Sequence, residues 1–195
     1  MVTIGLILLC AGEAGAQRQM EALGRGVIAV HSEEGKVFVG WRLLGTDPEG
    51  IAFNVYRKAG GAAPEKLNAE PIATATCMVD AGAKIDLANA YLVRPISGGA
   101  EREPSASFTL PAGAPVRPYI SIPLQTPEGT TPNDASVGDL DGDGEYDVVL
   151  HQASRGRDNA QPGTTGEPIL EAYDLDGTLM WRIRLGRNIR EGAHY

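Results

Sequence analysis

Short runs of alternating hydrophobic and polar residues, separated by glycine- and proline-rich turns, dominate the first half of the chain. In residues 51–57, Ile51, Phe53 and Val55 alternate with more polar positions, which is the period of a strand with one buried face. The pattern predicts further strands at residues 26–31, 36–44, 76–79, 90–95 and 105–110. Strands at this spacing, without a convincing helical period, predict an all-β fold with a β-sandwich of about seven strands in residues 17–114.

Two residues of this region have more than one interpretation. Trp41 stands between the apolar residues Val39 and Leu43, which favours a place in the core, and a platform for stacking a sugar ring is the alternative. Cys77 is the only cysteine after Cys10. A lone cysteine is most often a buried apolar residue, and we predict that role here.

The pattern changes after a Pro- and Gly-containing linker at residues 111–115. Strands are predicted at residues 118–124, 146–151, 168–174 and 178–183, and a long exposed loop at residues 154–166. The last two strands flank an Asp-Gly turn, and such a hairpin is typical of a propeller blade. Residues 115–195 are therefore predicted to begin a β-propeller. Asp174 and Asp176 in that turn could form a second, partial calcium site, but an ordinary turn accounts for them and is preferred.

The N-terminal residues bear on export, and the net charge of the chain bears on its partners. Residues 2–10 are apolar and precede Ala14-Gly15-Ala16, which predicts a signal peptide at residues 1–16 and a secreted or periplasmic protein. A buried first strand is the alternative. The formal net charge of −8 argues against a nucleic-acid partner. No apolar run reaches the roughly 18 residues that a membrane span needs.

The densest chemical signal is an acidic loop at residues 139–147. Carboxylates at alternate positions of a tight loop can all face one Ca²⁺ ion, which prefers oxygen ligands. The loop is not an EF-hand, because Leu150 occupies the twelfth position and residues 146–151 read as a strand. A solvated acidic turn without an ion is the alternative. The predicted ligands are the side chains of Asp139, Asp141, Asp143 and Asp147 and the main-chain carbonyl of Glu145.

Three segments carry a family resemblance: residues 38–57, 133–150 and 175–195. They resemble the amino-terminal part of the bacterial rhamnogalacturonan lyases of polysaccharide lyase family 11. The resemblance implies a fibronectin-III-like sandwich followed by an eight-bladed β-propeller. It also implies secretion, dependence on calcium, and cleavage of the rhamnogalacturonan I backbone of pectin.

The implied chemistry is β-elimination. A cation neutralises the galacturonate carboxylate, and a base then removes the adjacent C5 proton. The resemblance implies that Asn133 binds substrate. It also shows a departure, since His151-Gln152-Ala153 replace a Lys-Trp-Asp stretch that borders the cleft in the family. The role of the calcium ion, structural or catalytic, stays open at this point.

The catalytic residues are unknown and are expected downstream of Tyr195. An eight-bladed propeller needs several more blades of about 40–50 residues each, so we expect this chain to be incomplete and inactive by itself. The expected partner is a pectic polysaccharide, and the expected state is a monomer. The alternative function is a non-catalytic, calcium-stabilised carbohydrate-binding or adhesion module with integrin-like blades, and an inactive structural stub is the third possibility.

Overall fold

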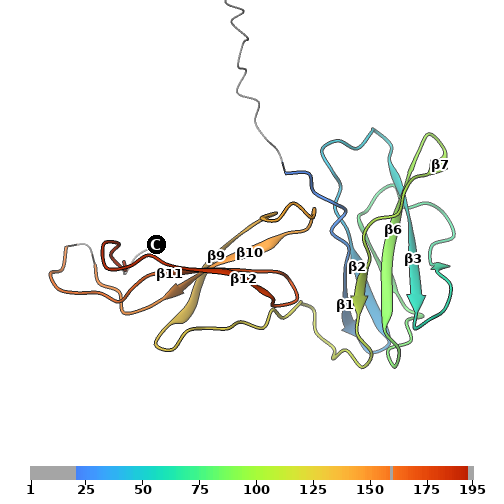
Figure 1. Cartoon of the computed structure of the whole chain (residues 1–195). Helices are drawn as coiled ribbons and strands as arrows, with labels where there is room; N and C mark the ends of the chain where they lie inside the picture. Colours follow the sequence, from blue (N-terminus) through green and yellow to red (C-terminus); the bar gives the residue numbers. More distant parts are fainter. Residues whose placement is uncertain (1–20, 159, 193–195) are drawn as a thin grey trace, which may run out of the picture.

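The computed structural model describes residues 21–158 and 160–192, and it contains twelve β-strands in three sheets. The prediction of an all-β fold is thereby confirmed for these residues. Figure 1 shows two layers of strands packed together and, beside them, a third sheet reached through an extended linker. The predicted signal peptide lies outside the described residues. Within the described ranges, no helix has the length and apolar character that crossing a membrane requires.

The first two sheets form the unit that we call the sandwich. One sheet has the order β1-β2-β5, and the other has the order β4-β3-β6-β7 with β8 also paired to β6. The eight strands are β1 (Ile28–Glu33), β2 (Lys36–Gly40), β3 (Ala52–Ala59), β4 (Glu65–Lys66), β5 (Cys77–Asp80), β6 (Asn89–Ser97), β7 (Ala100–Glu101) and β8 (Phe108–Leu110). β4 and β7 have only two residues each, too few to give an alternating signal in the sequence.

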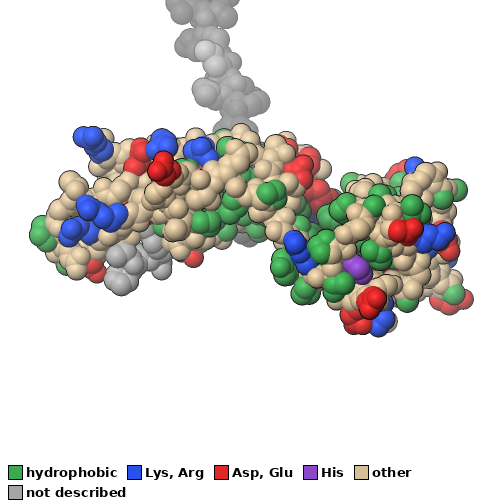
Figure 2. All heavy atoms as spheres, turned by 90° about the horizontal axis from the view of Figure 1, so that it is seen from below, with side chains coloured by type: hydrophobic (Ala, Val, Ile, Leu, Met, Phe, Trp, Pro, Cys, Tyr) green, Lys and Arg blue, Asp and Glu red, His purple; other side chains and the backbone are tan. Residues whose placement is uncertain are grey.

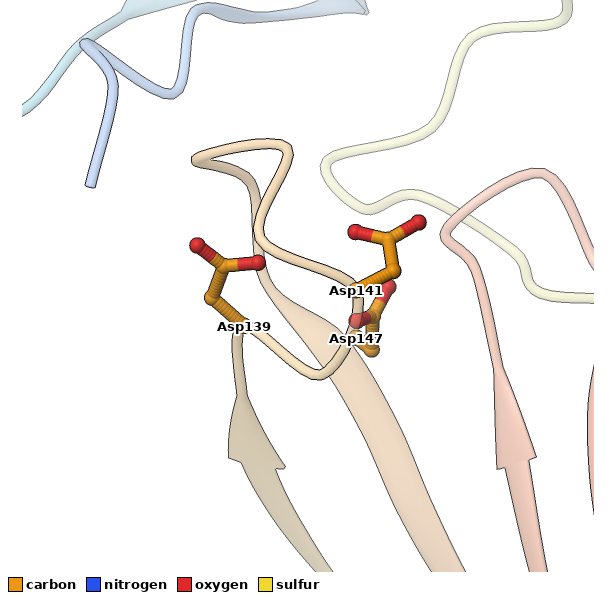
Figure 3. Close-up of side chains that lie close together, drawn as sticks. All are labelled: Asp139, Asp141 and Asp147. Carbon is orange, nitrogen blue, oxygen red and sulfur yellow. The ribbon is translucent and has the colours of Figure 1, made fainter. Parts of the chain in front are cut away.

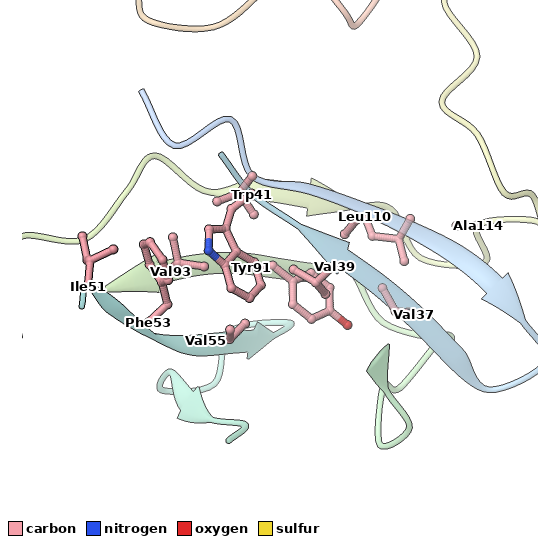
Figure 4. Close-up of a cluster of buried hydrophobic side chains, with 12 residues drawn as sticks. Val37, Val39, Trp41, Ile51, Phe53, Val55, Tyr91, Val93, Leu110 and Ala114 are labelled. Carbon is pink, nitrogen blue, oxygen red and sulfur yellow. The ribbon is translucent and has the colours of Figure 1, made fainter. Parts of the chain in front are cut away.

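The core of the sandwich lies between its two sheets, as Figure 4 shows. Val37 and Val39 of β2 meet Val55 of β3 and the buried residues of β6. Trp41, only 6% exposed, belongs to this cluster, and its ring centroid lies 5.5 Å from that of Phe53. The prediction that Trp41 is a core residue is confirmed. Burying such an aromatic side chain is worth about 1.5–3 kcal/mol or more.

Three predictions for this region need correction. Cys77 is exposed, not buried, because it begins β5 where the side chain faces outward. The strand predicted at 36–44 ends at Gly40, and the one predicted at 105–110 starts only at Phe108. Ser105 still bonds to β6, but its hydroxyl rather than its carbonyl accepts the N–H of Val93 at 3.0 Å, which interrupts the regular backbone ladder at this point.

The C-terminal sheet is a four-stranded antiparallel unit with the order β12-β11-β10-β9. Its strands are β9 (Thr131–Gly138), β10 (Asp147–Ala153), β11 (Ile169–Tyr173) and β12 (Leu179–Arg184). The β11–β12 hairpin, the strand that follows the acidic loop and the long loop after residue 153 are all as predicted.

One predicted strand of this region is wrong and another was missed. Residues 118–124 form no strand, since Pro118 and Pro123 remove two donors from the segment. β9 lies in residues for which the sequence pattern predicts no strand. Its residues are exposed up to Val137, so neither face of the strand packs against another layer and it carries no apolar alternation.

The acidic loop between β9 and β10 touches the sandwich directly. The main-chain N–H of Gly24 donates to the carbonyl of Gly144 at 2.7 Å. The N–H of Asp139 donates to Oε1 of Glu21 at 3.2 Å. The segment that leads into β1 therefore lies against this loop and fixes it relative to the sandwich.

Candidate metal centre and substrate edge

Three carboxylates of the acidic loop converge at one end of the C-terminal sheet (Figure 3). Asp139 follows β9, Asp141 lies in the loop, and Asp147 begins β10. One carboxylate oxygen from each lies within 4.8 Å of the others. Asp147 is buried, whereas Asp141 is exposed, so the cluster has an inner side in the protein and an outer side in solvent.

The loop itself holds these carboxylates in place. Asp139 accepts hydrogen bonds from the N–H of Gly142 at 2.8 Å and of Gly144 at 3.1 Å. Asp147 accepts one from the N–H of Leu140 at 2.8 Å. Gly142 and Gly144 have φ angles of +82° and +89°, a region that glycine adopts without steric cost. The positions of both glycines in the sequence are thus explained by the turn.

The arrangement fits a calcium ion. Ligands at 2.3–2.6 Å from Ca²⁺ on different sides of the ion stand up to about 5 Å apart, which matches the measured spread. Carboxylates are the hard oxygen donors that this ion prefers. Among the described residues no salt bridge joins Asp139, Asp141 or Asp147 to a basic side chain. A cation is the simplest partner for three such neighbouring acids.

The other two predicted ligands have different surroundings. The carboxylate of Asp143 accepts from the N–H of Glu145 at 2.7 Å and is not part of the three-carboxylate cluster. The side chain of Glu145 turns to the sandwich, where it lies 3.4 Å from Nη1 of Arg42. Partial burial raises the pKa of Glu145; Arg42 opposes this shift, while Asp143 and Asp139 add to it. The main-chain carbonyl of Glu145 stays a predicted ligand.

The Asp-Gly turn between β11 and β12 has ordinary turn hydrogen bonds. The N–H of Gly177 donates to the carbonyl of Asp174 at 3.0 Å, and Asp176 accepts from the N–H of Thr178 at 2.8 Å. Burial, and then the negative charges of Asp147 and other nearby acids, raise the pKa of Asp174. The turn therefore adds negative charge near the acidic loop.

The predicted substrate residue Asn133 lies toward the other end of β9. Six residues separate it from Asp139, which is about 20 Å along an extended strand. Its neighbour Asp134 lines a cavity of about 300 Å³ together with His151 and Arg190. The structure thus places Asn133 away from the acidic loop. It lies beside residues 151–153, where the sequence departs from the Lys-Trp-Asp stretch of the family that it resembles.

Sequence reasoning missed Glu191, which lies at this end and whose side chain is fully buried. Its Oε1 lies 3.3 Å from Nε2 of His151, and its Oε2 accepts from the hydroxyl of Ser154 at 3.1 Å. These partners are distant in the sequence, so no local pattern could have indicated the contact.

Two family profiles match the chain. The one described as the rhamnogalacturonan I lyase beta-sheet domain matches residues 18–110. The one described as the C-terminal domain of rhamnogalacturonan lyase family 11 matches residues 119–195. The chain is 45% identical to the rhamnogalacturonan endolyase YesW of Bacillus subtilis over 97% of its length, which is 32% of that relative. It is also 45% identical to the exolyase YesX of the same organism, covering 92% of this chain and 29% of that one.

Solved structures show the same fold. The crystal structure of exotype YesX aligns with a TM-score of 0.76 and 44% identity over 91% of this chain and 29% of that one. The family 11 rhamnogalacturonan lyase of Bacillus licheniformis gives a TM-score of 0.76 and 49% identity, again over 91% of this chain and 30% of that one. The chain spans about a third of the length of these relatives.

Proposed function

Because the chain belongs to rhamnogalacturonan lyase family 11, we propose that it is the N-terminal, calcium-binding part of a pectin-degrading rhamnogalacturonan lyase. The observation that carries the proposal is the succession of the two family profiles, in order, over most of the chain. The endolytic activity of YesW and the exolytic activity of YesX belong to proteins about three times as long.

We propose that Ca²⁺ binds the acidic loop through Asp139, Asp141 and Asp147, with Asp143 and the carbonyl of Glu145 as the further ligands expected from the sequence. Support comes from the convergence of three carboxylates within 4.8 Å. When bound, the ion supplies positive charge that offsets the repulsion among these acids and ties β9 to β10.

The proposed role of this ion is structural. A cation that neutralises a uronate carboxylate must contact the sugar, but Asn133 stands about 20 Å along the strand from Asp139. The chain's own contribution to the reaction is then to position substrate, through Asn133 and the neighbouring residues of the same end. The catalytic base is not assigned to any described residue.

We also propose a fold type for each of the two units of the chain and a secreted location for the protein. The four antiparallel strands of the C-terminal sheet match one blade of a propeller, eight-bladed as the resemblance implies, and the sandwich is proposed to be fibronectin-III-like. The apolar segment with its Ala-Gly-Ala site supports export by a signal peptide. A secreted protein meets pectin directly.

A chimera tests the proposal. Residues 21–195 replace the matching segment of YesX, and ultraviolet absorbance follows unsaturated uronide released from rhamnogalacturonan I in the presence of calcium. We expect product from rhamnogalacturonan I and none from polygalacturonan, which lacks rhamnose. A chimera that melts as cooperatively as YesX yet releases no unsaturated product from either polymer would contradict the proposed function.

A further inference from the structure

The C-terminal sheet separates its charges along its length. The charged side chains at the end that faces the sandwich are all acidic, namely Asp139, Asp141, Asp143, Glu145, Asp147, Asp174 and Asp176. The opposite end, formed by residues 154–168 and 184–192, carries Arg155, Arg157, Arg184, Arg187 and Arg190 against Asp158, Glu167 and Glu191. Figure 2 shows basic side chains gathered at the end away from the sandwich and acidic ones at the junction. An acidic protein thus presents a locally basic surface.

A cavity of about 700 Å³ opens at this basic end. Residues 163–167 form one wall, and Arg187 and Arg190 form the other. Its volume is within the range of about 300–1,000 Å³ that is usual for ligand sites. Because it shares Arg190 with the smaller cavity beside Asp134 and His151, the two cavities adjoin and together could accommodate more than one sugar unit.

The walls of the cavity are fixed by hydrogen bonds. Arg190 donates to the carbonyls of Gln161 at 2.6 Å and Gly163 at 3.0 Å. The hydroxyl of Thr165 accepts from the N–H of Glu191 at 3.2 Å. Arg190 therefore has a structural task, since it holds the long β10–β11 loop against the segment that follows β12. A preformed wall reduces the ordering cost of binding.

Arg187 differs from the other arginines of this end. Arg155, Arg157 and Arg190 donate to main-chain carbonyls, and Arg184 pairs with Glu167 at 3.0 Å. Arg187 is exposed and has neither a hydrogen bond nor an ion pair within the described ranges. A planar guanidinium with unused donors on a cavity wall is suited to bidentate pairing with a carboxylate.

We propose that the cavity lined by residues 163–167, Arg187 and Arg190 is a subsite for a uronate carboxylate, with Arg187 as the side chain that pairs with it. The inference rests on the proposed function for the identity of the polymer. Thr164, exposed on the facing wall, offers a hydroxyl to the sugar ring. This subsite recognises the negative charge of the substrate, and its distance from the acidic loop keeps it outside the metal centre.

Calorimetric titration of the full chain tests the subsite. The probes are a rhamnogalacturonan I oligosaccharide and the same oligosaccharide with its carboxylates methyl-esterified. We expect the wild type to prefer the free acid, and Arg187→Ala to weaken that binding at least tenfold and to remove the preference. Arg187→Lys, which keeps the charge without the planar fork, should fall between them. Arg117→Ala is the matched control, because Arg117 is also exposed and its side chain has no partner in the described part of the chain.

The outcomes separate this inference from the proposed function. If Arg187→Ala and the wild type bind the free acid equally, or if Arg117→Ala loses as much affinity, the subsite is refuted, while an active chimera with YesX would still uphold the lyase. Carboxylate-dependent binding that requires Arg187, together with an inactive chimera, would uphold the subsite and refute the lyase. A wild type that binds neither oligosaccharide also refutes the subsite.

Discussion

The guanidinium of Arg42 lies over the ring of Tyr146, with Cζ 4.3 Å from the ring centroid. Arg42 follows the core residue Trp41 of the sandwich, and Tyr146 belongs to the acidic loop. Nη1 of Arg42 also donates to the carbonyl of Gly144 at 3.1 Å. One side chain thus joins the sandwich to the loop by a cation–π contact and a hydrogen bond. The order of the loop and the docking of the sandwich are therefore expected to be coupled.

The first prediction is that Arg42→Lys loosens this junction. Lysine keeps the charge but lacks the planar fork that reaches both Gly144 and the Tyr146 ring. We expect the free energy of unfolding in urea to fall by about 1–2 kcal/mol and proteolysis within residues 115–130 to become faster. Arg94→Lys is the control, since Arg94 makes an exposed pair with Glu101 at 3.8 Å, worth less than about 1 kcal/mol. Equal losses in both variants would contradict a specific junction.

The second prediction concerns calcium and the identity of its ligands. Scanning calorimetry should show a lower melting temperature of the wild type in chelator than in Ca²⁺, since a ligand at a hundredfold excess over its Kd stabilises by about 2.7 kcal/mol. Asp141→Ala should abolish this shift, because it removes one of the three converging carboxylates. Glu128→Ala, which removes an exposed carboxylate outside the loop, should retain it. If chelator leaves the melting temperature of the wild type unchanged, the loop binds no ion.

The strands of this protein were predictable where apolar and more polar side chains alternate along the sequence. The alternation of Ile51, Phe53 and Val55 reports the core position of β3 directly. β9 gave no such signal, because its side chains up to Val137 remain in water on both faces of the strand. The ladder hydrogen bonds that define it are made by the backbone, which the side-chain pattern does not record.

The cluster of Asp139, Asp141 and Asp147 was predictable because its three carboxylates come from one loop. Alternate spacing places Asp139 and Asp141 near each other, and Asp147 returns at the start of β10. The spacing could not show that Glu145 turns away to Arg42, a contact between residues 103 positions apart in the sequence. Likewise, the pairing of His151 with Glu191 depends on where the segment after β12 returns to the sheet. Such contacts are set by tertiary packing rather than by local pattern.

The third prediction separates backbone strain from domain contact in the acidic loop. Gly142 and Gly144 both have φ near +85°, but a Cβ at Gly142 meets nothing within 4 Å, while at Gly144 it would lie 2.9 Å from the main-chain nitrogen of Gly24. Gly142→Ala should cost about 1–2 kcal/mol of unfolding free energy from strain alone. Gly144→Ala should cost more, and hydrogen exchange of the Gly24 amide should accelerate only in this variant. If the Gly24 amide exchanges at the same rate in both variants, the close approach of residue 144 to Gly24 is ruled out.

The full linker between β8 and β9, residues 111–130, is attached to the C-terminal sheet through a buried carboxylate. Glu171 accepts hydrogen bonds from Gln152 Nε2 at 2.6 Å, from the Tyr173 hydroxyl at 2.7 Å and from Nε of Arg182. Arg182 and Tyr173 in turn bind the carbonyl and the N–H of Gln125 in the linker. Burial alone would raise the pKa of Glu171, but these donors outweigh it and lower the pKa.

The last prediction follows from the sign of that shift. Since the folded pKa of Glu171 is below its unfolded value, the carboxylate stabilises the fold above the unfolded pKa of about 4.3, and this contribution is lost as the pH falls through the folded pKa. Glu171→Gln should therefore lower the free energy of unfolding by about 2–3 kcal/mol at neutral pH, and the difference from wild type should shrink below about pH 4. Urea denaturation of the variant and the wild type at neutral pH and below about pH 4 measures this difference in the free energy of unfolding. Glu128→Gln, an exposed acid in the linker, should have little effect at either. A Glu171→Gln deficit that stays constant with pH would mean that the charge of Glu171 does not hold the linker in place.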